Sequence, residues 1–272
     1  MKKLKSILFY FALTISALIF IYPFYWMIMG SVAPENEIGN LTLLPTSLTL
    51  SSYSQMVDKI PIGGAFINSL IVATSITIGV LVFGSMIGYA LSKLTFKGRD
   101  FIFYIIIFTM TLPFQITLIP QYIIMVKFGW IDTYLALIVP YLINALSIIM
   151  FRQYFKSIPD SLIDAARLDG CNEMQIIFRI LWPNSMPAIV TIGIITFMAS
   201  WNEVLWPLIV IRDQSLMTMP QLVTLFSVGG RAESQLGVKL ASAVMLALPI
   251  ILAYLFFQKY FIQSMASTGI KE

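Results

Sequence analysis

Long apolar runs alternate with short polar segments along this chain of 272 residues. The first run covers residues 7–29 without a single charge. At about 1.5 Å per helical residue, it is long enough to cross a hydrocarbon core of about 30 Å. Further apolar runs cover residues 67–91, 101–125, 135–151, 185–211 and 240–257. Because lipid offers backbone N–H and C=O groups no partner, the pattern predicts an all-α integral membrane protein with six transmembrane helices.

A cleaved signal peptide is the alternative interpretation of the first run. Three lysines, Lys2, Lys3 and Lys5, precede it, as in a signal peptide. The run is longer than the usual apolar region of about 7–15 residues, however, and it ends in the bulky segment Y-P-F-Y-W-M-I-M, where a cleavage site requires small residues. We therefore expect a retained membrane span.

The distribution of lysine and arginine predicts the orientation of the spans. Six spans place both termini on one side of the membrane. That side carries Lys2, Lys3, Lys5, Lys93, Lys97, Arg99, Arg152, Lys156, Arg167, Arg179, Lys259 and Lys271. The other side carries Lys59, Lys127, Arg212, Arg231 and Lys239. Because loops rich in lysine and arginine remain in the cytoplasm, both termini are expected to be cytoplasmic.

The segment between the fourth and fifth runs is too charged to lie in lipid. Its charged residues are Arg152, Lys156, Asp160, Asp164, Arg167, Asp169, Glu173 and Arg179. The stretch S-I-P-D at 157–160 predicts the start of a helix, with Ser157 or Ile158 as the cap, and Gly170 predicts its end. Ala165 and Ala166 are expected to form a surface of small side chains that another protein can approach closely.

A second helix is predicted after Gly170. Met174, Ile177, Phe178 and Leu181 follow the spacing i, i+3, i+4 and i+7, which places them in one apolar stripe. Pro183 is expected to end this helix before the fifth span. Amphipathic helices in loops often pack against the spans of their own chain, so the pattern alone leaves open whether the segment binds another protein.

The composition excludes several kinds of active site. The chain has no histidine and a single cysteine, Cys171, so we expect no His/Cys metal site, no disulfide and no histidine-dependent triad. It has no G-x-x-x-x-G-K-[ST] motif and therefore no loop to hold the phosphates of ATP. The net charge is +4, but the basic residues lie near span ends instead of in a stripe, so we expect no nucleic-acid partner.

Glu203 is the only acidic residue inside the predicted spans. Together with Trp201, Asn202 and Trp206 it forms a polar and aromatic cluster suited to sugar rings and hydroxyls, which makes these residues candidates for the substrate pathway. Alternatively, Glu203 lies at the membrane interface and the tryptophans belong to an aromatic belt. Gln115 is a further candidate, although single amides in spans commonly hold helices together.

The loop resembles the signature of bacterial ABC importer permeases, which is E-A-A, three residues, G, nine residues, I-x-L-P. This chain has D-A-A-R-L-D-G at 164–170 and I-L-W-P at 180–183. Asp164 stands in place of the glutamate and Trp182 in place of the leucine. From Phe66 onwards, segments such as G-Y-A-L-S-K (88–93) and W-N-E-V-L-W-P-L (201–208) also resemble carbohydrate importer permeases similar to the MalG component of the maltose importer.

The resemblance implies a type I ABC importer permease fold with a cytoplasmic coupling helix, in a bacterial cell membrane. The implied partners are a homologous second permease, two copies of an ABC ATPase, an extracytoplasmic solute-binding protein, membrane lipid and a sugar. ATP and Mg²⁺ would be held by the ATPase, so this chain is expected to bind no cofactor and to catalyse no reaction. The residues expected to couple to the ATPase are Asp164, Ala165, Ala166, Asp169, Gly170, Ile180 and Pro183.

Three regions are expected on this basis. Residues 1–65 would form an N-terminal transmembrane helix and an extracytoplasmic loop. Residues 66–258 would form the transmembrane core, with the coupling loop at 152–184, and residues 259–272 a cytoplasmic tail. Glycerol 3-phosphate or another polar solute is the alternative substrate. A proton-coupled secondary transporter that uses Glu203 is the alternative of a different class, and a membrane enzyme is disfavoured because histidine and clustered membrane carboxylates are lacking.

Overall fold

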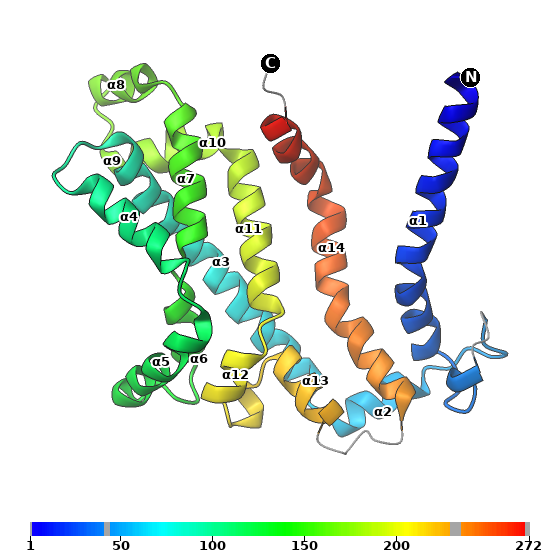
Figure 1. Ribbon diagram of the computed structural model, residues 1–272. Coiled ribbons are helices and arrows are strands. Elements are labelled where there is room, and N and C mark those ends of the chain that lie inside the picture. Colours follow the sequence, from blue (N-terminus) through cyan, green and yellow to red (C-terminus); the bar gives the residue numbers. More distant parts are fainter. Residues whose placement is uncertain (1, 41–43, 229–234, 270–272) are drawn as a thin grey trace. The chain divides into compact units, whose positions relative to one another are not determined.

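All regular structure within the described residues is helical (Figure 1). The computed structural model describes residues 2–40, 44–228 and 235–269. Arg231 and Lys271, two of the residues used to predict orientation, and the end of the predicted tail lie outside these ranges. In the described part, three helices are long and apolar enough to cross a membrane, and six spans result if each of three bent helix pairs counts as one.

The chain divides into two compact units. Unit 1 comprises Met1–Gly63 and Leu222–Ile250. It contains α1 (Lys2–Ser31), η1 (Ile38–Asn40), α2 (Ser51–Lys59), most of α13 (Met219–Val228) and the first part of α14 (Leu236–Gly269). The carboxylate of Glu35 accepts hydrogen bonds from the backbone N–H groups of Leu236 and Gly237, so it caps the positive N-terminal end of α14.

Unit 2 comprises Gly64–Gln221 and Ile251–Glu272. It contains most of α3 (Ile62–Lys93), followed by α4 (Arg99–Thr109), α5 (Phe114–Phe128), α6 (Tyr134–Ile138), η2 (Val139–Tyr141), α7 (Ala145–Ser157), α8 (Asp160–Leu168), α9 (Glu173–Gln175), the π-helix η3 (Ile176–Leu181), α10 (Trp182–Asn184), α11 (Met186–Trp201), α12 (Leu205–Val210) and η4 (Gln214–Leu216). One apolar core joins α3, α7, the loop helices, α11 and α12.

The predicted third span, 101–125, is not one continuous helix. It consists of α4 and α5, which meet at an angle of 102°. Pro113 is the N-cap of α5, and a proline disfavours helical geometry at the residue before it. With 11 residues, α4 is only about 16 Å long and cannot cross a bilayer by itself.

The fourth and fifth spans are also broken. The segment Tyr134–Tyr141 meets α7 at 40°, and Asn144 caps α7 by accepting a hydrogen bond from Ser147 N at 2.8 Å. α7 continues to Ser157, beyond the predicted end at residue 151. The segment Glu173–Asn184 meets α11 at 91°, and α11 ends at Trp201 instead of continuing to residue 211.

Polar contacts between distant residues hold the segment after α12 in unit 2. The Asp132 carboxylate accepts hydrogen bonds from the backbone N–H groups of Arg212 and Asp213, and these bonds hold the pKa of Asp132 below its usual value. The Asn68 amide donates to Ser215 O at 2.8 Å. Asp132 is 80 or more positions away from both of its partners, so no local pattern in the sequence reveals this pairing.

Two glycines let α3 approach α7 closely. A Cβ at Gly84 would lie 2.8 Å from Ser147 Oγ, and one at Gly88 would lie 2.6 Å from Phe151 Cβ and 3.0 Å from Arg152 N. The 2.6 Å distance at Gly88 is shorter than real Cβ contacts, so a side chain there requires α7 to shift. Small residues four apart commonly permit such contacts between membrane helices.

Gly88→Ala is expected to destabilise the protein by about 1–3 kcal/mol, because the backbone of α7 must move to admit the methyl group. Gly64→Ala on the same helix is the matched control, since no atom lies within 4 Å of its added Cβ. The measurement is thermal unfolding of the two detergent-solubilised variants. Equal unfolding temperatures would contradict the close contact between α3 and α7.

Candidate functional site

The helix α8 begins and ends in the charged loop. It starts at Asp160 with Pro159 as its N-cap, one residue after Ile158 and two after Ser157, the predicted caps. At its end, Cys171 N donates to Ala166 O and Gly170 N donates to Arg167 O, which is the Schellman arrangement. Gly170 has a φ of +83°, so it ends α8 in the left-handed conformation as predicted.

The two faces of α8 have different surroundings. Ile163 and Ala166 are buried against unit 2, whereas Ala165 is exposed. The prediction that both alanines form one outer surface is therefore wrong for Ala166. Leu168, which no pattern in the sequence indicated, has an exposed fraction of 89%. The outer face consists of Leu162, Asp164, Ala165, Leu168 and Asp169.

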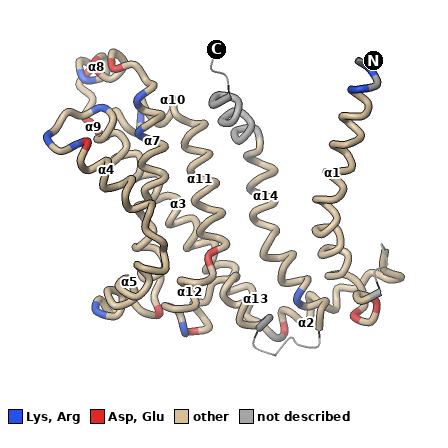
Figure 2. Tube along the Cα trace, viewed as in Figure 1, with Lys and Arg blue, Asp and Glu red and all other residues tan. Residues whose placement is uncertain are grey.

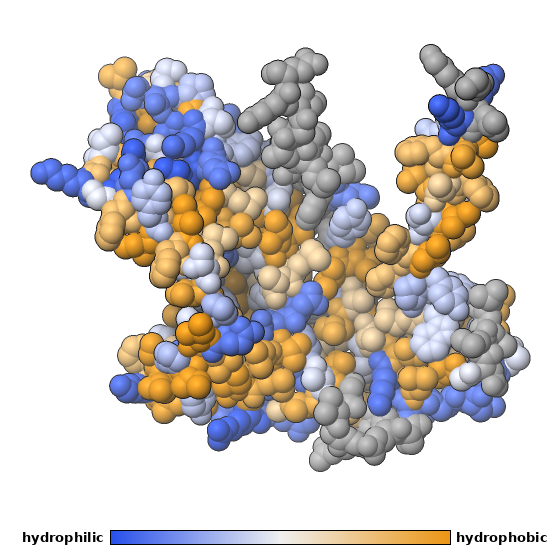
Figure 3. Space-filling model, in the orientation of Figure 1, coloured by the Kyte–Doolittle hydropathy of each residue, from blue (hydrophilic) through white to orange (hydrophobic). Residues whose placement is uncertain are grey.

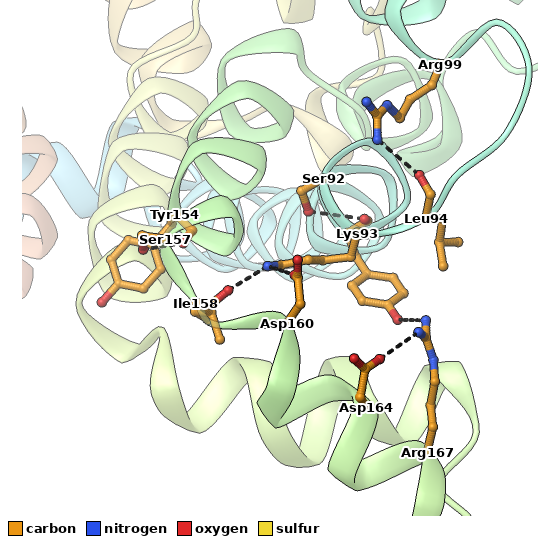
Figure 4. Close-up of polar contacts among 11 residues, drawn as sticks. Ser92, Lys93, Leu94, Arg99, Tyr154, Ser157, Ile158, Asp160, Asp164 and Arg167 are labelled. Atoms are coloured by element: carbon orange, nitrogen blue, oxygen red, sulfur yellow. Dashed lines mark hydrogen bonds and ion pairs between the residues drawn. The ribbon is translucent and has the colours of Figure 1, made fainter.

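Charged side chains gather around α8. Within unit 2 most charged residues lie at the end that carries α8 and α9 or at the end that carries α5 and α12 (Figure 2), and hydrophilic residues cover the α8 end (Figure 3). Arg167 donates from Nε to Glu173 Oε1 at 3.1 Å. It also lies 3.6 Å from Asp164 (Figure 4). The hydrogen bond to Glu173 raises the pKa of Arg167 above its ordinary value, so the guanidinium keeps its charge.

The second loop helix packs mainly against its own chain. Ile177 and Leu181 are buried, and only Met174 of the predicted apolar stripe is exposed. The stripe therefore does not form a free docking surface. Ile180 is half-buried in the π-helix η3. The exposed Pro183 lies one residue before Asn184, where the helical segment ends ahead of α11, so the helix stops within one residue of the predicted position.

A cavity of about 480 Å³ opens in unit 2, between α3, α7, α11 and α12. Its wall is mainly apolar, and its polar members are Thr109, Tyr141, Asn144, Ser147, Thr196, Ser200, Glu203 and Thr218. The Thr218 hydroxyl is buried and has no hydrogen-bond partner among the described residues. No lysine or arginine lies among the lining residues. Such a wall offers hydroxyl, amide and carboxylate groups to a polar uncharged ligand.

Glu203 is the predicted pathway residue with the clearest place in the cavity. It lies in the break between α11 and α12, where its Oε1 accepts a hydrogen bond from Trp206 N at 3.1 Å. Trp206 contributes to the wall, but its indole N–H donates to Ala136 O at 2.8 Å. Tyr141 and Thr218 carry no signal in the sequence, because hydroxyl residues are common in loops and spans.

The other predicted pathway residues lie outside the cavity wall. Trp201 is 1% exposed and packs against Phe66 and Phe197, with ring centroids 5.5 and 5.8 Å away. Asn202 and Gln115 are exposed. Trp201 and Trp206 are buried in unit 2, so neither forms part of an aromatic belt at the lipid interface. In the described part of the chain, no group of three or more acidic or cysteine residues could hold a metal ion.

Comparisons with known proteins place this arrangement in a family. The model of the family described as "Binding-protein-dependent transport system inner membrane component" matches residues 80–267. The arabinooligosaccharides transport system permease protein AraQ of Halalkalibacterium halodurans is 35% identical over 261 residues, covering 94% of this chain and 92% of that protein. The lactose transport system permease protein LacG of Rhizobium radiobacter is 31% identical, with 97% and 96% covered.

A solved structure has the same fold. The crystal structure of a bacterial ABC transporter involved in the import of the acidic polysaccharide alginate contains a chain that aligns with a TM-score of 0.82 and 27% identity, covering 95% of this chain and 97% of that one. The predicted type I permease fold is therefore confirmed. This chain belongs to the family of binding-protein-dependent transport system inner membrane components, the multi-pass membrane subunits of ABC importers.

Proposed function

We propose that this chain forms, with a homologous second permease, the membrane pathway for uptake of a neutral sugar or oligosaccharide. An extracytoplasmic binding protein delivers the solute. Two copies of a partner ATPase bind ATP and Mg²⁺ and supply the energy, since this chain has no motif that could hold the phosphates. The observation that carries the substrate assignment is the cavity beside Glu203, whose wall has hydroxyl and amide groups and no basic side chain.

The chemistry of this wall favours a neutral solute over the alternative, glycerol 3-phosphate. A phosphate is normally bound by arginine, lysine or a cluster of backbone N–H groups. Here the charged group in the wall is the carboxylate of Glu203, which repels an anion. The names of the relatives AraQ and LacG, an arabinooligosaccharides and a lactose permease, support the same choice.

The outer face of α8 is the proposed contact with the ATPase. At its centre is the small apolar side chain of Ala165, and the exposed Leu168 can insert into a cleft of the partner. Asp164 and Asp169 offer carboxylates at the edge. Gly170 sets the direction of the chain after the helix. Ile180 and Pro183 lie further along the loop and do not belong to this outer face.

An uptake panel tests the proposed function. Cells that express the complete transport system are given radiolabelled arabinotriose, maltose or lactose, with sn-glycerol 3-phosphate and an alginate trisaccharide as anionic probes. We expect accumulation of at least one neutral sugar, and its loss when the chain, the binding protein or the ATPase is deleted. Accumulation of an anionic probe without any neutral sugar would contradict the substrate assignment.

The orientation with both termini and residues 152–184 in the cytoplasm is part of the proposal and has a simple test. Cys171 is the only cysteine and is partly exposed directly after α8. A membrane-impermeant maleimide is expected to label it in inside-out vesicles and not in intact cells. The chain is expressed without its partners so that they do not cover the thiol, and Cys171→Ser gives the background. Labelling in intact cells would show that the loop faces outward and would contradict the proposed orientation.

A further inference from the structure

Two polar side chains near the end of α3 face the loop that contains α8. Tyr89 and Lys93 are four residues apart, so they lie on the same face of α3. Tyr89 is 2% exposed, and the Lys93 side chain is 6% exposed. An ammonium group and a hydroxyl that are withdrawn from water to this degree require polar partners.

The partners of Lys93 lie at the beginning of α8. Its Nζ donates to Asp160 Oδ1 at 2.5 Å and to Ile158 O at 2.6 Å (Figure 4). Asp160 is the first residue of α8, and its own side chain remains largely exposed. The contact therefore ties the first turn of α8 to the end of α3.

The partners of Tyr89 lie at the end of α8 and just beyond it. The Tyr89 hydroxyl donates to Glu173 Oε2 and accepts a hydrogen bond from Arg167 Nη2 at 3.2 Å. Arg167 also donates to both carboxylate oxygens of Glu173, at 3.1 and 3.3 Å. These three side chains form a closed network that joins α3, the last turn of α8 and the first residue of α9.

The two contacts together control the orientation of α8. Asp160 and Arg167 are seven residues apart, which is about 10 Å along a helix. A single attachment point would allow α8 to turn about it, whereas two points at opposite ends prevent that rotation. Between them, Ile163 and Ala166 are buried against the core of unit 2, so the inner face of α8 is held along its length.

α3 also reaches the cavity. Val72 and Ile76 line it, and the helix is unbroken from Ile62 to Lys93. The rise from Ile76 to Lys93 is about 25 Å. α3 packs closely on α7, which lines the same cavity, through Gly88 and Phe151. A displacement of α8 that moves α3 with it therefore also moves the cavity wall.

We propose that Tyr89 and Lys93 are positioning residues that make α8 and α3 move as one body. A force applied to the outer face of α8 then displaces the wall of the transport cavity instead of tilting α8 alone. This inference rests on the proposed function, in which that outer face contacts the ATPase. It adds that productive transport requires the polar attachment of α8 to α3, in addition to the ATPase contact.

The first test removes the polar groups and keeps the bulk of the side chains. In Tyr89→Phe/Lys93→Met, we expect the ATPase to copurify and to hydrolyse ATP at a rate within 2-fold of wild type. The amount of sugar imported per ATP hydrolysed in proteoliposomes is expected to fall about 5-fold or more, measured with the neutral sugar that wild type accumulates in the uptake panel. Asp100→Asn is the matched control, because Asp100 is an exposed carboxylate at the start of α4 whose ion-pair partner is its neighbour Arg99.

A merely structural role predicts a different result. Loss of stability alone lowers membrane levels, ATP hydrolysis and uptake together and leaves the ratio of sugar to ATP unchanged. An unchanged ratio in the double variant overturns the inference. The proposed function fails separately, when wild type itself neither copurifies the ATPase nor accumulates a sugar.

The second test replaces one polar contact by a covalent link. Lys93→Cys/Asp160→Cys is made in a Cys171→Ser background, and a short bifunctional methanethiosulfonate reagent joins the two thiols. The unlinked variant is expected to import less sugar per ATP than wild type. The link is expected to restore the ratio of sugar to ATP, and a reducing agent that breaks the link is expected to lower it again. If the link instead blocks uptake, α8 must move relative to α3 during transport and the inference is wrong.

Discussion

Gly170→Pro is expected to lower sugar uptake by about 10-fold or more while the chain remains in the membrane, which corresponds to about 1.4 kcal/mol or more at the affected step. Gly170 has a φ of +83°, and its N–H donates to Arg167 O at 3.1 Å. Proline restricts φ to about −65° and has no N–H, so the variant loses both the turn and the hydrogen bond. The end of α8 and the proposed ATPase contact would then be displaced.

The control for Gly170→Pro is a glycine with the same backbone conformation elsewhere. Gly129 ends α5 with a φ of +66° and likewise has open space around it. Gly129→Ala and Gly170→Ala impose a similar strain of about 1–2 kcal/mol, and both are mild enough to compare as folded proteins. Uptake and ATPase copurification should fall only for Gly170→Ala. Equal values for the two variants would remove the coupling role of this turn.

Glu203→Gln is expected to reduce initial uptake about 10-fold, because a carboxylate that accepts sugar hydroxyls forms hydrogen bonds worth about 1.5–3 kcal/mol, more than a neutral amide provides. Glutamine keeps an oxygen that can accept the hydrogen bond from Trp206 N, so the local fold at the start of α12 should persist. The experiment measures uptake over a range of sugar concentrations at matched membrane levels.

Asp213→Asn is the matched control for the loss of charge. The Asp213 carboxylate also accepts a backbone hydrogen bond, from Ser215 N at 2.9 Å, but it is exposed and lies outside the cavity wall. Wild-type uptake in Glu203→Gln at every concentration would contradict a pathway role. Trp201→Ala is a poor test of the same question. Trp201 is fully buried, and its truncation would cost about 3–5 kcal/mol of stability whatever its role in transport.

The bends in the spans show where hydropathy alone was insufficient. The run 101–125 is apolar throughout, so its composition is equally compatible with one straight helix and with α4 and α5 at 102°. Pro113 marks the place of the break, but a proline in an apolar run is compatible with a kink as well as with a complete break. Packing of α5 and α6 against α12 decides between these outcomes.

In the loop, too, the sequence predicted local backbone features but not which single residues are buried. The glycine at 170 was predicted to end a helix, and it does so because backbone preferences act locally. Which of the adjacent residues Ala165 and Ala166 faces outward depends on where α8 packs. The predicted apolar stripe after Gly170 is present, but Ile177 and Leu181 are buried against their own chain, so the stripe is not free to bind a partner.

The sequence by itself determined that the chain is helical and membrane-embedded, that a charged loop lies between the fourth and fifth apolar runs, and that Gly170 turns the chain there. These properties follow from local composition and from backbone preferences that act over a few residues. Only the tertiary structure decided which polar groups line the cavity beside Glu203 and which side chains hold α8. Tyr89 and Arg167 are 78 positions apart and meet only because α3 and α8 pack together, and contacts over such separations leave no periodic signal in one sequence.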